Sequence, residues 1–223
     1  MKKIGFTLAE VLVTLAIIGV VATMTLPALM TNTQEQQAKT GLKKGINTLT
    51  EAAQTNQAID GFDYAGLREE SGAVSDDDVE TQQSMTGLLV NRTQIDYRAS
   101  NNGGSGDANL VDATAANYVV FFRDGSAVSY PRAAQANIAE ANAIEPDGLA
   151  HGFGVVYDYN GVKKPNLLSN CHGNTTMTAD SFVSDEDREC SKANRVIKDQ
   201  FGIRLRGPFA FPNGAAARWA FEN

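Results

Sequence analysis

The side chains that could act as nucleophile, base or metal ligand are few and widely spaced. His151 and His172 are the only histidines, and neither lies in a His-Glu-x-x-His or triad-type motif. Cys171 precedes His172, but neighbours in a chain seldom face each other productively, and Cys190 offers a disulfide partner instead. No phosphate-binding loop or dinucleotide fingerprint occurs. The sequence therefore predicts that the chain is not an enzyme and needs no cofactor.

Two groups of oxygen-bearing side chains can be compared with calcium sites. Residues 76–78 are three aspartates, without the turn glycine and distal glutamate of a recognised calcium loop, which favours a solvated acidic loop. Asp158 and Asn160 precede Gly161, and side-chain bonds to the backbone of a turn are favoured there over a metal. We predict no metal site.

Glu10 is a more unusual carboxylate, because it opens a long apolar block. Residues 11–34 carry no charge at all. A charged side chain at the centre of a membrane helix costs roughly 2.5 kcal/mol or more and is a functional candidate by default. Either Glu10 has a charged partner, or it lies among the lipid headgroups.

The apolar block has the length of a membrane span. The 25 residues from Phe6 to Met30 cover about 37 Å as a helix, against about 30 Å of hydrocarbon. Lys2 and Lys3 precede them and favour a cytoplasmic amino terminus. A cleaved secretory signal is the alternative, but the sequence TNTQEQQAK that follows offers no convincing cleavage site.

The segment KKIGFTLAEVLVTLAIIGVVATMTLPAL resembles the class III signal of type IV pilins and of type II secretion pseudopilins. The resemblance implies that a prepilin peptidase cuts between Gly5 and Phe6 and methylates the new amine of Phe6. It also implies that Glu10 neutralises this amine on a neighbouring subunit during assembly. Pro27 lies where family members carry a helix-distorting proline, although a proline there can also end the helix at Leu26.

The resemblance further implies an α+β type IV pilin fold, with a leader at 1–5, a membrane and assembly helix at 6–57, and a head at 58–223. The helix would pack on a small antiparallel sheet. An apolar stripe at helical spacing supports its polar second half; it comprises Ala38, Leu42, Ile46, Leu49 and Ala53. Gly41 and Gly45 either allow close packing on the sheet or lie on a solvated face.

Two hairpins are expected in the head. Asp124-Gly125 lies between apolar runs of strand-forming residues and suits a tight turn. The second turn comprises Asp158, Asn160 and Gly161, and with the following Pro-Asn it resembles a hairpin familiar in the pilin-like family.

The last third of the chain holds both cysteines. Cys171 and Cys190 are 19 residues apart, and a bridge of that span contributes about 3 kcal/mol in the chain-entropy model. A disulfide is expected if the chain is exported, and many pilins have a disulfide-bounded carboxy-terminal region. Four later aromatics predict a final edge or covering segment that packs on the sheet: Phe209, Phe211, Trp219 and Phe221.

Composition narrows the choice of partner. The 223 residues carry a formal charge of −7 and show no basic stripe, which argues against nucleic-acid binding. The resemblance implies a subunit of a type IV pilus used in adhesion, motility or surface display. Its partners would be other subunits, the prepilin peptidase, the membrane and an inner-membrane assembly platform. A secretion pseudopilin is the alternative, and a DNA-binding minor pilin is a weaker one. The chain would reside in the inner membrane first, then in an extracellular pilus or a periplasmic pseudopilus.

Overall fold

The computed structural model describes residues 7–67, 83–100, 117–131, 152–177 and 189–223. The Gly5–Phe6 junction, the aspartates at 76–78 and His151 lie outside the described residues. The chain divides into two compact units, Met1–Gln37 and Ala38–Asn223. This boundary falls inside the long helix, whereas the sequence placed the start of the head after the helix.

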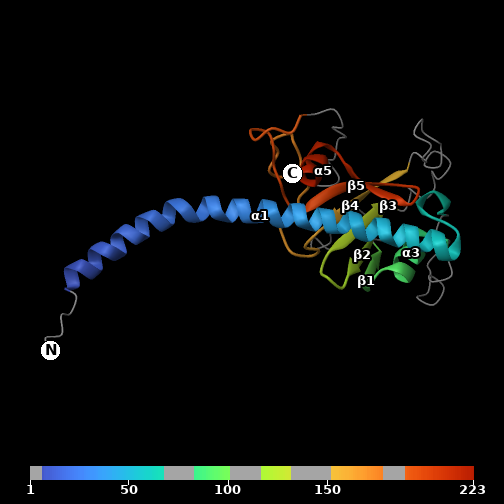
Figure 1. The fold of residues 1–223 in the computed structure, drawn as a ribbon, viewed down its shortest axis with the longest axis horizontal. Helices are drawn as coiled ribbons and strands as arrows, with labels where there is room; N and C mark the ends of the chain where they lie inside the picture. The colour runs from blue at the N-terminus through green and yellow to red at the C-terminus, as the bar shows by residue number, and fades with distance from the viewer. Residues whose placement is uncertain (1–6, 68–82, 101–116, 132–151, 178–188) are drawn as a thin grey trace. The chain divides into compact units, whose positions relative to one another are not determined.

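The described elements are one long helix, three short helical segments and six strands (Figure 1). In chain order they are α1 (Leu8–Asp60), the 3₁₀ helix η1 (Tyr64–Gly66), α3 (Met85–Arg92), β1 (Ile95–Ser100), β2 (Asn117–Phe122), β3 (Ala127–Pro131), β4 (Phe153–Asp158), β5 (Gln200–Arg206), β6 (Phe209–Asn213) and α5 (Ala215–Glu222).

Helix α1 is continuous over 53 residues. It passes through Pro27, so the alternative that the helix ends at Leu26 is wrong. It also runs three residues beyond the predicted end at Gln57, and Gly61 follows it with a positive φ of 79°. Glycine is the residue that adopts this left-handed conformation at a helix end without steric cost.

The second half of α1 packs on one face of the sheet, as Figure 1 shows. The predicted apolar stripe is confirmed, because all five of its residues are buried in the core shared with the strands. Gly41 lies against Tyr159, and Gly45 lies against the ring of Tyr157, so closely that a Cβ atom at either glycine would overlap the tyrosine. The glycines therefore serve close packing rather than a solvated face.

The six strands form one antiparallel sheet in the order β1-β2-β3-β4-β5-β6. The predicted hairpin between β2 and β3 is confirmed, and Asp124 Oδ1 closes its turn by accepting the Ser126 amide at 2.9 Å. The sheet face that packs on α1 carries the largest buried strand side chains, among them Tyr130, Tyr157 and Phe201. The fold is thus the α+β arrangement of a pilin, with a long amino-terminal helix on an antiparallel sheet.

One expectation about the head needs correction. The turn at Asn160-Gly161 does not close a tight hairpin, because the next strand, β5, which pairs with β4, begins only at Gln200. A two-residue turn pattern shows where a strand ends but not where the chain returns. The final segment forms the edge strand β6, and Trp219 and Phe221 of α5 pack against the core. Phe209 and Phe211 are 38% and 37% exposed, because on β6 they alternate with the buried Ala210 that faces the core.

Candidate assembly site and head contacts

Glu10 lies in the first turn of α1, where it forms a reciprocal hydrogen-bonded cap with Thr7. Glu10 Oε2 accepts hydrogen bonds from the backbone amide and the hydroxyl of Thr7, both at 2.8 Å. The Glu10 amide in turn donates to the Thr7 hydroxyl oxygen at 3.3 Å. This is a capping box, and the spacing Thr-x-x-Glu is its sequence signature. The prediction from sequence did not include this role, although the signature is local and recognisable.

The helix segment that begins at the capping box is apolar and exposed. Leu8–Leu26 has a mean hydropathy of 2.1 over 19 residues, and none of it is buried in the isolated chain. By length and composition this segment can cross a membrane. The hydroxyls within it bond to carbonyls of the helix itself, as Thr14 does to Val11 and Thr23 to Val20, each at 2.9 Å. Few polar groups inside the span therefore depend on water.

The Asp158 side chain joins the predicted turn residues through hydrogen bonds. Asp158 Oδ1 accepts the amides of Asn160 and Gly161 at 3.0 and 2.9 Å, and Gly161 has a φ of 64°. Asp158 Oδ2 accepts the side-chain amide of Gln200 at 3.3 Å. The Asp158 side chain thus fastens the end of β4 to the start of β5.

A second buried carboxylate, Asp199, lies near Asp158 and was not predicted from the sequence. Its two oxygens accept the amides of Asn166 and Leu167 at 2.7 and 2.9 Å. Burial, followed by the negative charge of Asp199, raises the pKa of the Asp158 carboxyl to about 8. The described part of the chain contains no group of three or more His, Cys, Asp or Glu side chains arranged to hold a metal ion.

The segment between β4 and β5 is closed by the predicted disulfide. Cys171 and Cys190 are bonded, with their Cα atoms 5.2 Å apart. Cys171 is buried against Ala215 and Ala216 of α5. The disulfide therefore packs on the carboxy-terminal helix, which the sequence pattern did not predict as a helix.

Trp219 of α5 joins three parts of the head. Lys39 of α1 lies 4.2 Å from the centre of the Trp219 ring, and the Arg195 guanidinium lies 3.7 Å from it. Cations are attracted to the electron-rich face of an indole ring. The contacts tie α5 to α1 on one side and to the segment that follows Cys190 on the other.

The comparison with known protein families identifies the amino-terminal segment. Residues 1–26 match the family model described as the prokaryotic N-terminal methylation motif. The chain therefore carries a class III signal of the type IV pilin and pseudopilin kind. Such a signal implies processing by a prepilin peptidase and assembly into filaments, and with the apolar helix it fits a membrane-anchored precursor. No curated protein and no solved structure matches the chain.

Proposed function

We propose that the chain is a structural, non-catalytic subunit of a type IV pilus or pilus-like filament that serves adhesion, motility or surface display. The observation that carries the proposal is the capped Glu10 at the start of an uncovered 19-residue apolar helix, within residues that match the methylation motif. An apolar surface of this length needs lipid or neighbouring helices as its environment. Filament assembly provides the neighbouring helices.

In this proposal the chain has three parts with separate tasks. Residues 1–5 are a leader that is removed by cleavage between Gly5 and Phe6, followed by methylation of the Phe6 amine. Residues 6–57 hold the subunit in the inner membrane and then pack in the filament core, where Pro27 loosens the helix. Residues 58–223 form the head, outside the cytoplasm.

Cleavage supplies the charge that Glu10 needs. The new amine at Phe6 is a cation, and opposite charges attract more strongly at low dielectric than in water. A buried charge left alone is heavily penalised. The capping box gives the Glu10 carboxylate two donors from Thr7 while the subunit is alone. Pairing with the amine of the next subunit then fixes the axial stagger between subunits.

A pseudopilin of a type II secretion system shares all of these amino-terminal features and is the alternative. A large, loop-rich head favours the pilus, whereas the disulfide between Cys171 and Cys190 fits both locations, because the periplasm and the exterior are both oxidising. The location separates the two proposals: a pilus is extracellular, whereas a pseudopilus is periplasmic. The inner-membrane assembly platform and further copies of the chain are the proposed partners in either case.

The test examines sheared surface filaments from cells with and without the gene, by electron microscopy and mass spectrometry. We expect filaments that contain this chain with a methylated Phe6 as its first residue. An intact Met1 would contradict the processing step. Finding the chain only in periplasmic assemblies would favour the pseudopilin.

Variants at Glu10 test the charge pairing. Glu10→Gln keeps a side-chain oxygen for the Thr7 amide but removes the charge, so it separates capping from ion pairing. We expect Glu10→Gln to insert into the membrane normally and to lose most filament assembly. Glu35→Gln, at the next carboxylate along α1, is the matched control and should assemble normally. Normal filaments from Glu10→Gln would contradict the proposed role.

A further inference from the structure

A cleft of about 440 Å³ opens in the head between α1, the end of α3 and the turn that joins β2 to β3. Its volume lies within the range of small-molecule sites, roughly 300 to 1,000 Å³. Its floor is formed by the buried side chains of Ala52, Phe122 and Tyr157. Its walls are polar and include Lys44, Thr48, Glu51, Thr55, Arg92, Thr93, Gln94, Arg123, Asp124 and Ser126.

The cleft gathers cations in a chain that is acidic overall. It gathers three cations, Lys44, Arg92 and Arg123, against two carboxylates, Glu51 and Asp124. Lys44 is already paired with Asp124 at 2.7 Å. Arg92 is paired with Asp60. Arg123 therefore carries the positive charge that is open to a ligand, and it favours one negative charge rather than several.

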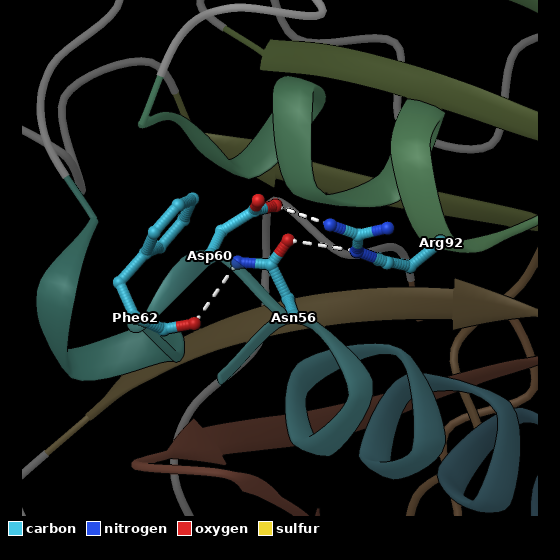
Figure 2. A network of polar contacts seen from close by, with 4 residues as sticks. All are labelled: Asn56, Asp60, Phe62 and Arg92. Atoms are coloured by element: carbon cyan, nitrogen blue, oxygen red, sulfur yellow. Dashed lines mark hydrogen bonds and ion pairs between the residues drawn. The ribbon is translucent and has the colours of Figure 1, made fainter. Parts of the chain in front are cut away.

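Arg92 is held in place by the end of α1, as Figure 2 shows. Its Nε donates to Asn56 Oδ1 at 3.0 Å, and one terminal nitrogen is paired with Asp60. Asn56 is itself fixed by a bond from Nδ2 to the carbonyl oxygen of Phe62 at 2.9 Å. The Arg92 side chain is only 16% exposed. These contacts fix the direction of the guanidinium, which has five N–H donors in all.

Arg123 differs from Arg92 because its guanidinium has no hydrogen-bond or ion-pair partner among the described residues. Its backbone is fixed, since the Arg123 amide donates to the Gln94 carbonyl oxygen at 2.9 Å. A planar guanidinium binds a carboxylate through two parallel hydrogen bonds. Arg123 is thus the natural anchor for a ligand carboxylate at the mouth of the cleft.

The rest of the rim suits hydroxyl groups. Thr48 and Thr55 follow one another on the same side of α1, seven residues apart, and Gln94 faces them from the start of β1. Hydroxyl and amide side chains both donate and accept hydrogen bonds, and Glu51 adds an acceptor. The apolar floor offers a surface for C–H groups. A doubly charged phosphate is matched less well, because Arg123 alone would face it and Glu51 adds a negative charge nearby.

We propose that this cleft binds an acidic sugar unit of the uronic acid type, with its carboxylate on Arg123 and its hydroxyls on the threonine, glutamine and glutamate side chains. A hydroxylated ring with one negative charge matches both the polar rim and Arg123, the cleft's one cation without an ion-pair partner among the described residues. The site lies in the head and does not depend on polymerisation, so it stands or falls separately from the filament function.

The test uses the full chain in a detergent without a sugar headgroup and in a buffer without carboxylates. Binding of glucuronate and galacturonate is measured by saturation-transfer NMR and by calorimetry, with glucose, galactose and acetate as comparisons. We expect at least one uronate to bind with a dissociation constant of about 1 mM or below, as small ligands of this size do. Its affinity should exceed that of each comparison by at least about tenfold.

Two variants test the assignment. Arg123→Gln should weaken uronate binding by about tenfold or more, whereas Lys192→Gln, an exposed cation outside the cleft, should leave it unchanged. Near-UV circular dichroism confirms that each variant is folded. Equal affinity for the uronates and the neutral sugars would overturn the proposal. So would binding of acetate as tight as that of the uronates, or wild-type affinity in folded Arg123→Gln.

Discussion

The contact between Gly45 and Tyr157 permits a quantitative prediction about how the head is held on α1. Gly45 is buried in the middle of the helix, and a Cβ atom at this position would overlap the Tyr157 ring. Tyr157 is only 2% exposed, and its hydroxyl is hydrogen-bonded to Ser126. The side chain is therefore packed against protein except where it borders the cleft.

The expected effect of Gly45→Ala is the balance of a gain in helix propensity and a loss in packing. Alanine is favoured over glycine inside a helix by roughly 0.5–1 kcal/mol. Overpacking a filled core costs typically about 1–3 kcal/mol. Because the new Cβ atom would overlap three atoms of a buried ring, we expect the packing cost to exceed the gain in helix propensity. The free energy of unfolding should fall by about 1–2 kcal/mol.

The assay is urea unfolding of the full chain in detergent, followed by the fluorescence of Trp219, the only tryptophan. Far-UV circular dichroism checks that both signals report one transition. Asn47→Ala is the matched control, because Asn47 is exposed on the same helix. It gains helix propensity without a packing cost, so it should leave stability unchanged or raise it by a few tenths of a kcal/mol.

A second variant makes the reasoning specific to this contact. Tyr157→Leu removes the atoms that the new methyl group would overlap. The double variant Gly45→Ala/Tyr157→Leu should then be more stable than the sum of the single effects, by about 1 kcal/mol. Strict additivity, or a Gly45→Ala variant as stable as the wild type, would refute the account.

Two further predictions concern the segment between β4 and β5. The pKa of Asp158 is raised to about 8, so the folded chain binds more protons than the unfolded chain between about pH 4 and pH 8. The free energy of unfolding should therefore fall as pH rises through this window, by on the order of 2 kcal/mol or more. Asp158→Asn should flatten this dependence in urea titrations from pH 5 to pH 9. A wild-type free energy of unfolding that does not change with pH would contradict this prediction. Reducing the disulfide should lower stability by about 3 kcal/mol and shift Trp219 emission to longer wavelength, since α5 packs on the bridge; unchanged emission and unchanged urea midpoint would count against this.

Local features of the fold were readable from the sequence because each depends on residues close together in the chain. The periodicity from Ala38 to Ala53 indicated one face of a helix, and Asp124-Gly125 indicated one turn between two strands. The capping box at Thr7 and Glu10 is equally local, but the charge of Glu10 pointed first to a partner on another subunit.

Features that join distant segments could not be predicted from the sequence in this way. The turn at Gly161 signalled the end of β4, but the next strand, β5, which pairs with β4, begins only at Gln200. Asp158 and Asp199 come together only because β4 and β5 pair. The exposure of Phe209 also depends on tertiary packing, since the face of β6 that is covered depends on where α1 lies.

The sequence by itself determined the amino-terminal signal, the long apolar helix and the pair of cysteines, because hydropathy, charge and motif spacing are properties of the chain before it folds. Only the tertiary structure determined which side chains come together on the surface of the head. The cleft around Arg123 draws on α1, α3 and the turn between β2 and β3, which are separated by long stretches of chain. Side chains converge in that way only after the sheet has paired and α1 has packed on it.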